Sequence, residues 1–240
     1  MSLLKLDIYA VRNIQRQSLH LSPTLNFFYG PNASGKSALI EAVFILGRAR
    51  SFRSPTIKPV INFQQDHLTV TGQLLNSNGL NRFLGIQLNG KKIDIRIDQQ
   101  TVQRRSDLAY ALPLQFFHPK SYELLDGGSQ LRREFLDWGV FHDNEKFLPI
   151  WRKFKKALSQ RNSLLKTKQN ALLNVWNKEL VNYGTIVDSY RQQYLEKFIP
   201  NFIKIVHRFI EIDGIELKAL SGWDTTKDFH QVLQDDLEKD

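Results

Sequence analysis

The amino-acid sequence predicts an α/β fold with a P-loop lobe that contains an antiparallel β meander, together with a mainly helical lobe. Three patterns indicate this fold. Residues 30–37 match the phosphate-loop pattern G-x-x-x-x-G-K-[ST]. Residues 68–75 and 83–97 alternate apolar and polar side chains around turns rich in asparagine and glycine, as antiparallel strands do. Apolar residues between 120 and 212 recur at helical spacing instead.

The same patterns divide the chain into three segments. Residues 1–119 are expected to form the P-loop lobe, and residues 120–212 a helical lobe inserted into it or appended to it. Residues 213–240 are expected to begin a return to the first lobe. Short apolar runs and periodicity predict further elements, namely strands at 3–9, 25–29, 114–117 and 214–220, a helix from Lys36 onward and a short amphipathic helix at 226–238.

Composition narrows the classes of function. The formal net charge of +9 over 240 residues favours polyanionic partners such as nucleic acid, although many basic proteins have no such partner. No stretch approaches the roughly 18 apolar residues that cross a bilayer, so we expect no membrane segment. The chain has no cysteine, which excludes disulfides and cysteine zinc sites and fits a cytoplasmic protein.

The phosphate-loop pattern has a physical reason at each fixed position. Glycines let the backbone curl so that successive N–H groups face one concavity, and the following helix adds its positive end. The lysine can bind the β- and γ-phosphates of ATP, and the next hydroxyl can ligate the Mg²⁺ that bridges them. The alternative is a glycine-rich turn without a ligand. The expected nucleotide-binding residues are Gly30, Pro31, Asn32, Ala33, Ser34, Gly35, Lys36 and Ser37, with Ser37 as the Mg²⁺ ligand.

A phosphate loop binds nucleotide but does not hydrolyse it without a second acidic residue, which usually follows an apolar strand. Three segments come near this pattern and end at Asp137, Asp188 and Asp213. The first two lie in helical patterns, and Glu211 interrupts the third. Catalytic residues for hydrolysis are therefore not expected in this chain, and neither is the signature motif of the ABC class.

Five segments carry a resemblance to a known family. They are the opening strand and turn at 6–14, the loop and helix at 32–42, an SFR element at 50–53, and two specific segments at 127–138 and 158–166. Together they resemble the RecF family of ABC/SMC-type ATPases. The resemblance implies an ABC-ATPase-like fold for the first lobe. Because family members are longer, it also implies that this chain is either a fragment of a longer protein or the product of a degenerate gene.

The resemblance further implies a function in DNA repair and replication and in the SOS response. RecF-like proteins bind ATP, form ATP-dependent homodimers, bind DNA at single-strand/double-strand junctions and help to load recombinase with RecO and RecR. By this resemblance Arg12 and Asn13 would lie near the adenine, and Arg53 near the phosphates or the dimer face.

A run of cations predicts where DNA would bind without sequence specificity. No acidic residue lies between Glu145 and Glu179, and a helical surface without counter-charge suits phosphate backbones. The alternatives are a solvated helix face or a subunit contact. Arg132 and Arg133 could instead pair with Asp137 inside the helical lobe. The candidate DNA-binding residues are Lys153, Lys155, Lys156, Arg161, Lys166 and Lys168.

Two other functions remain open from the sequence. A stand-alone P-loop nucleotide kinase would share the phosphate loop, and a non-catalytic module could keep the helical lobe only to dock partner proteins. The leading hypothesis is an ATP-binding DNA-repair protein of RecF type.

Overall fold

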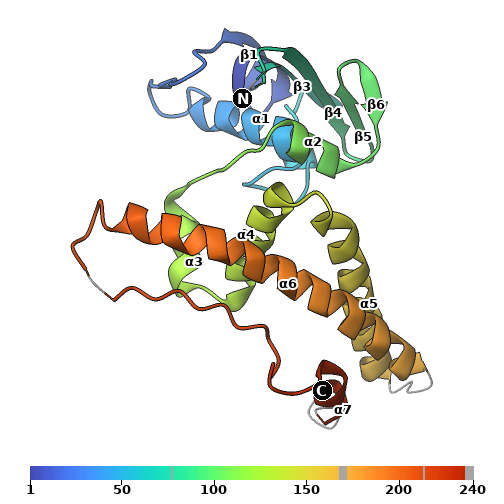
Figure 1. Ribbon diagram of the computed structural model, residues 1–240. Coiled ribbons are helices and arrows are strands. Elements are labelled where there is room, and N and C mark those ends of the chain that lie inside the picture. The colour runs from blue at the N-terminus through green and yellow to red at the C-terminus, as the bar shows by residue number, and fades with distance from the viewer. Residues whose placement is uncertain (77, 168–171, 213, 236–240) are drawn as a thin grey trace. The chain divides into compact units, whose positions relative to one another are not determined.

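A computed structural model describes residues 1–76, 78–167, 172–212 and 214–235 (Figure 1). The chain forms two compact units, Met1–His118 and Pro119–Asp240. Their boundary falls beside the proline at which the sequence pattern changes from alternating to helical.

The first unit is built on one antiparallel sheet of six strands in the order β2-β1-β3-β4-β5-β6. The predicted strand at 3–9 and the predicted meander are confirmed, whereas two of these strands, the second and the sixth, were not predicted. The strands are β1 (Ser2–Val11), β2 (Ile14–His20), β3 (His67–Leu75), β4 (Asn81–Asn89), β5 (Ile93–Ile97) and β6 (Gln100–Val102).

Helix α1 (Lys36–Arg48) lies on the apolar face of this sheet, beside α2 (Arg105–Ala111) (Figure 1). Alternation along the strands places Leu6, Ile8 and Val70 on that face, where they form a core with Leu46 of α1. Gly72 in β3 lets the helix come close. A Cβ there would lie 2.6 Å from Cδ2 of Leu46, so a larger residue would push the helix away.

Three predicted strands, at 25–29, 114–117 and 214–220, are wrong. No residue in these ranges belongs to a strand, and none pairs with the six strands of the described chain. A strand exists only where another backbone edge accepts its hydrogen bonds, and apolar composition does not supply that edge. Phe27 and Tyr29 are 79% and 93% exposed, and Phe116 packs on Phe44 and Phe52 as part of an aromatic cluster instead.

The second unit is mainly helical, as predicted. Helix α5 and the first half of α6 form an antiparallel hairpin, and α4 packs on α6 (Figure 1). The structure also places residues 221–235 on this unit, where Ser221 donates to Asp188 and Phe229 lies against Gly184. The helices are η2 (Pro119–Tyr122), α3 (Glu123–Asp126), α4 (Ser129–Asp143), α5 (Phe147–Thr167), α6 (Leu173–Val206) and α7 (Phe229–Asp235), the last within the helix predicted at 226–238.

A half-buried carboxylate joins three of these helices. Asp137 on α4 accepts a hydrogen bond of 2.8 Å from the indole of Trp151 on α5 and forms an ion pair of 2.7 Å with Arg191 on α6. The expected pairing of Asp137 with Arg132 or Arg133 is wrong, because Asp137 faces the other helices. Arg132 donates to backbone carbonyls before α4, and Arg133 donates to Ser129.

No helix in the described part of the chain is both long enough and apolar enough to cross a lipid bilayer.

The packing of α1 on the sheet gives a first prediction. Replacement Leu46→Ala should lower the free energy of unfolding by about 2–5 kcal/mol, because it leaves a cavity at a fully buried position under β3. The measurement is urea denaturation followed by far-UV circular dichroism. The control Leu80→Ala, at a leucine that is 65% exposed, should change stability by less than about 0.5 kcal/mol. Equal losses in both variants would contradict this account of the core.

Candidate nucleotide-binding site

The backbone of residues 30–37 curls through three positions of positive φ, at Gly30 (151°), Ala33 (65°) and Gly35 (97°). A curl of this kind turns successive N–H groups toward one side. Helix α1 begins at Lys36, directly after the last of these three positions, and its cap residue Gly35 offers no side-chain hydrogen bond to the first N–H groups of the helix. These N–H groups and the positive end of the helix dipole are therefore not used by a protein cap, which favours an anion at this position.

The lysine of the loop lies across its opening residues. Its Nζ donates to the carbonyl oxygens of Gly30 at 2.8 Å and Pro31 at 2.7 Å, which closes the loop into a ring from residue 30 to residue 36. The hydroxyl of Ser37 belongs to an exposed residue in the first turn of α1. An ammonium, a helix N-terminus and an exposed hydroxyl thus lie within one turn of backbone.

This set of groups fits a nucleoside triphosphate with Mg²⁺. The glycine at position 30 is required for the curl, since a Cβ there would lie 3.2 Å from Oγ of Ser34 and would need a φ that side chains rarely adopt. Lys36 would hold the phosphate oxygens, and Ser37 would provide one ligand to the metal.

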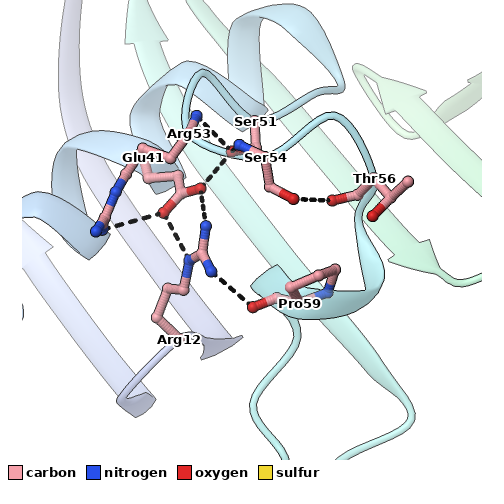
Figure 2. A network of polar contacts seen from close by, with 7 residues as sticks. All are labelled: Arg12, Glu41, Ser51, Arg53, Ser54, Thr56 and Pro59. Atoms are coloured by element: carbon pink, nitrogen blue, oxygen red, sulfur yellow. Dashed lines mark hydrogen bonds and ion pairs between the residues drawn. The ribbon is translucent and has the colours of Figure 1, made fainter.

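A buried carboxylate lies one and a half turns along the same helix. Glu41 has no exposed surface, and it accepts hydrogen bonds from Nε and Nη2 of Arg12 at 2.9 and 2.8 Å (Figure 2). Ser51 donates to the same carboxylate, and Nη1 of Arg53 lies 3.8 Å from it. The hydrogen bond with Glu41 raises the pKa of the Arg12 guanidinium above its usual value. Burial of a carboxylate is costly unless it is paired in this way.

The network joins three segments that are distant in the sequence. Arg12 comes from the turn between β1 and β2, and its Nη1 also donates to the carbonyl of Pro59 at 2.7 Å (Figure 2). Ser51 caps a short turn by accepting the backbone N–H groups of Arg53 and Ser54, each at 2.9 Å. The side chain of Glu41 therefore fixes the segment around residues 51–54 and the β1–β2 turn against the helix of the phosphate loop.

Sequence analysis missed Glu41, although a signal was present. Residues 38, 42 and 45 lie on the buried side of α1, and position 41 shares that side by helical spacing. A charged residue on a buried helix face requires a partner of opposite charge. The structure places the expected adenine contact Arg12 on this carboxylate, and places Asn13 beside the loop, where its Nδ2 donates to the carbonyl of Ala33 at 2.9 Å.

The expected DNA-binding cations fall into three groups. Lys153, Lys155, Lys156 and Lys166 are exposed on α5. Arg161 is a correction: it is 4% exposed, and its Nε donates to Asn177 of α6 at 2.9 Å, so it is a residue of the hairpin core. Lys168 lies outside the described residues. Two of the exposed cations lie over aromatic rings of their own unit, Lys153 over Tyr183 at 5.2 Å and Lys155 over Trp151 at 5.5 Å.

Two of the acidic residues considered for hydrolysis lie on helices and not after a strand. Asp137 is on α4 and Asp188 is on α6, where Ser221 donates to it at 2.9 Å. Asp213 lies outside the described residues.

Comparison with known proteins decides the family. The family model described as the RecF/RecN/SMC N terminal domain matches residues 2–222. A DNA replication and repair protein RecF from Azotobacter vinelandii is 42% identical over 243 residues, which cover 100% of this chain and 67% of that protein. The chain belongs to the RecF family. A RecF of Pseudomonas aeruginosa is 40% identical and is covered over 66% of its length, so the chain spans about two thirds of these relatives.

Solved structures of the RecF family share the fold. The structure described as the recombination mediator protein RecF-ATP in the RecFOR pathway superposes with a TM-score of 0.81 at 23% identity. The match covers 99% of this chain and 69% of that chain. A second structure of the same mediator, with ATPrS, gives a TM-score of 0.79 at 22% identity. The predicted RecF resemblance and the predicted α/β fold are therefore confirmed.

The buried ion pair gives a second prediction. Replacement Arg12→Ala should lower the free energy of unfolding by about 3 kcal/mol, because Glu41 would keep its burial and lose its main partner. Chemical denaturation followed by circular dichroism measures this loss. The control Lys5→Ala removes an exposed pair of 3.2 Å with Asp7 on the same strand and should cost at most about 1 kcal/mol. A loss for Arg12→Ala no larger than that of the control would contradict the structural role of this pair.

Proposed function

We propose that this chain is the ATP-binding part of a RecF-family protein that acts in DNA replication and repair. The observation that carries the proposal is the backbone curl at 30–37, with Lys36 folded over it, at the start of a helix in a RecF fold. Relatives of 40–42% identity are named DNA replication and repair proteins, and a protein of the same fold has been solved with ATP.

ATP would bind with its phosphates in the curl. The N–H groups of the loop and of the first turn of α1 would hold the phosphate oxygens, and Lys36 would exchange its two carbonyl partners for the β- and γ-phosphates. Mg²⁺ would neutralise charge on the same phosphates, with Ser37 as its protein ligand. Arg12 and Glu41 would fix the wall of the site, since their side chains already bind each other.

Binding is expected without turnover by this chain. Hydrolysis requires a group that orients water beside the γ-phosphate, and the acidic residues considered above were the candidates for it. Asp137 on α4 forms an ion pair with Arg191, and Asp188 on α6 accepts a hydrogen bond from Ser221, so neither is proposed as that group.

Nucleotide binding is the third prediction. The wild-type chain should bind ATP with Mg²⁺ in isothermal titration calorimetry, and Lys36→Ala should weaken binding at least about tenfold, because a charge-assisted contact is worth roughly 1.5–3 kcal/mol. The control Lys58→Ala removes a lysine from the short helix η1 (Lys58–Val60) and should bind ATP like the wild type.

The other two functions predict different results in the same experiment. A partner-docking module would bind no ATP, either as the wild-type chain or as Lys36→Ala. A stand-alone kinase would form ADP when a nucleoside monophosphate is added, whereas the proposed protein would not.

DNA would bind along α5. Arg152, Lys155, Lys156 and Lys166 lie at spacings of three, four and fourteen residues, which places them on one side of the helix over about 21 Å. Charges on one side of a rigid helix can face successive phosphates without reading bases. We further propose that the protein binds gapped DNA and acts with RecO and RecR. It would form an ATP-dependent homodimer and help to load recombinase in the SOS response, in the cytoplasm.

The fourth prediction concerns salt. The triple replacement of Lys155, Lys156 and Lys166 by alanine should reduce the slope of log K against log salt by about 2–3 for gapped duplex DNA, because each phosphate contact contributes roughly 0.9. Fluorescence anisotropy between about 50 and 200 mM salt measures this slope. Replacement of Lys58, Lys91 and Lys92 removes the same charge from the first unit and should leave the slope unchanged. Equal effects of both triples would show that net charge, and not α5, decides binding.

A further inference from the structure

A side chain from the neighbouring β1–β2 turn contacts the outer side of the phosphate loop. Nδ2 of Asn13, in the turn between β1 and β2, donates to the carbonyl of Ala33 at 2.9 Å. Ala33 is the one non-glycine residue of the curl with a left-handed backbone, at φ 65°. Such a conformation persists where its surroundings hold it in place.

The peptide bond between Ala33 and Ser34 couples this outer hydrogen bond to the direction of an N–H group inside the loop. Because the peptide is planar and trans, the C=O of Ala33 and the N–H of Ser34 point in opposite directions. The N–H of Ser34 is directed at the carbonyl oxygen of Pro31, 3.4 Å away, and Nζ of Lys36 donates to the same oxygen at 2.7 Å. The amide of Ser34 and the ammonium of Lys36 therefore converge on one point, while Asn13 holds the other side of the same peptide.

Packing supports the same contact. A Cβ built at Gly35 would lie 3.4 Å from Nδ2 of Asn13 and 3.5 Å from Cγ1 of Ile14, so this turn lies directly against the second half of the loop. The loop cannot relax toward that side without displacing Asn13.

The turn that carries Asn13 is itself held at several points. Arg12 has a left-handed φ of 55°, its N–H donates to Val60 at 2.8 Å, and its carbonyl accepts from the buried Asn62 at 2.7 Å. Its guanidinium is bound by Glu41. Asn13 thus extends from a fixed support toward the loop.

We propose that Asn13 is a positioning residue of the phosphate loop, which orients the Ser34 amide toward bound phosphate, and that it does not recognise the adenine base. This inference rests on the proposed binding of nucleotide at 30–37. It assigns to Asn13 a role different from the adenine contact that the family resemblance implied.

The test separates the phosphate chain from the base. ATP and inorganic tripolyphosphate, each with Mg²⁺, are titrated into the wild type, Asn13→Ala and Gln15→Ala by calorimetry. A positioning residue should weaken both ligands by the same factor, about two- to tenfold for one hydrogen bond. Gln15 is the matched control, because it lies on the same hairpin and its side chain donates to Gln64 at 3.2 Å. Its replacement should change neither affinity.

A loss confined to ATP would assign Asn13 to the base and overturn the inference, as would unchanged affinity for both ligands. These results leave the proposed function standing. Wild-type protein that binds neither ligand, or Lys36→Ala that binds both normally, would instead refute the proposed function. Asn13 is exposed, so Asn13→Ala should fold, which circular dichroism verifies. If it does not fold, Asn13→Ser, whose hydroxyl is too short to reach Ala33, replaces it in the same comparison.

Discussion

The geometry of the first unit depends on the carboxylate of Glu41. A charge without exposed surface must be matched within the protein, and here Arg12 supplies two parallel hydrogen bonds while Ser51 supplies a third. Glu41 lies five residues after Lys36, about 7.5 Å along the helix axis. The start of α1 therefore cannot turn relative to the end of β1 without separating a buried ion pair. A polar requirement inside the fold thus fixes the place where phosphate would bind.

Apolar packing fixes the same helix from its other end. Leu46 lies over Gly72, where the absence of a side chain lets α1 approach β3 closely. Further along, Arg48 donates to the carbonyl of Leu114 at 3.0 Å, and burial together with the charge of Arg50 lowers its pKa to about 10. Because close packing resists sliding and the ion pair resists rotation, the loop before α1 has a rigid base.

Features that depend on neighbouring residues in the sequence were predicted, and features that depend on distant residues were not. The phosphate loop was predictable because eight consecutive residues carry its backbone requirements, and the meander because alternation is visible within each strand. The strand expected at 25–29 failed because pairing depends on residues elsewhere in the chain. The prediction that Arg161 binds DNA was wrong for another reason. It was based on charge alone and did not consider which side of the helix each residue occupies. Arg161 lies nine residues after Arg152, which is about two and a half turns, so it lies on the opposite side of α5, where it donates to Asn177.

The two proposed anion-binding features would have different physical origins. Around the sheet, two surface cations each lie beside a carboxylate, in the pairs Lys92–Asp94 at 3.0 Å and Arg82–Asp98 at 3.0 Å, so the fields of these two cations are partly cancelled. The chain between Glu145 and Glu179 has no acidic residue, and the cations of α5 add to one another within a screening length of about 8 Å. The phosphate loop instead directs backbone dipoles at one point. Its selectivity for phosphate would come from the direction of single N–H groups, so an uncharged residue such as Asn13 can contribute there.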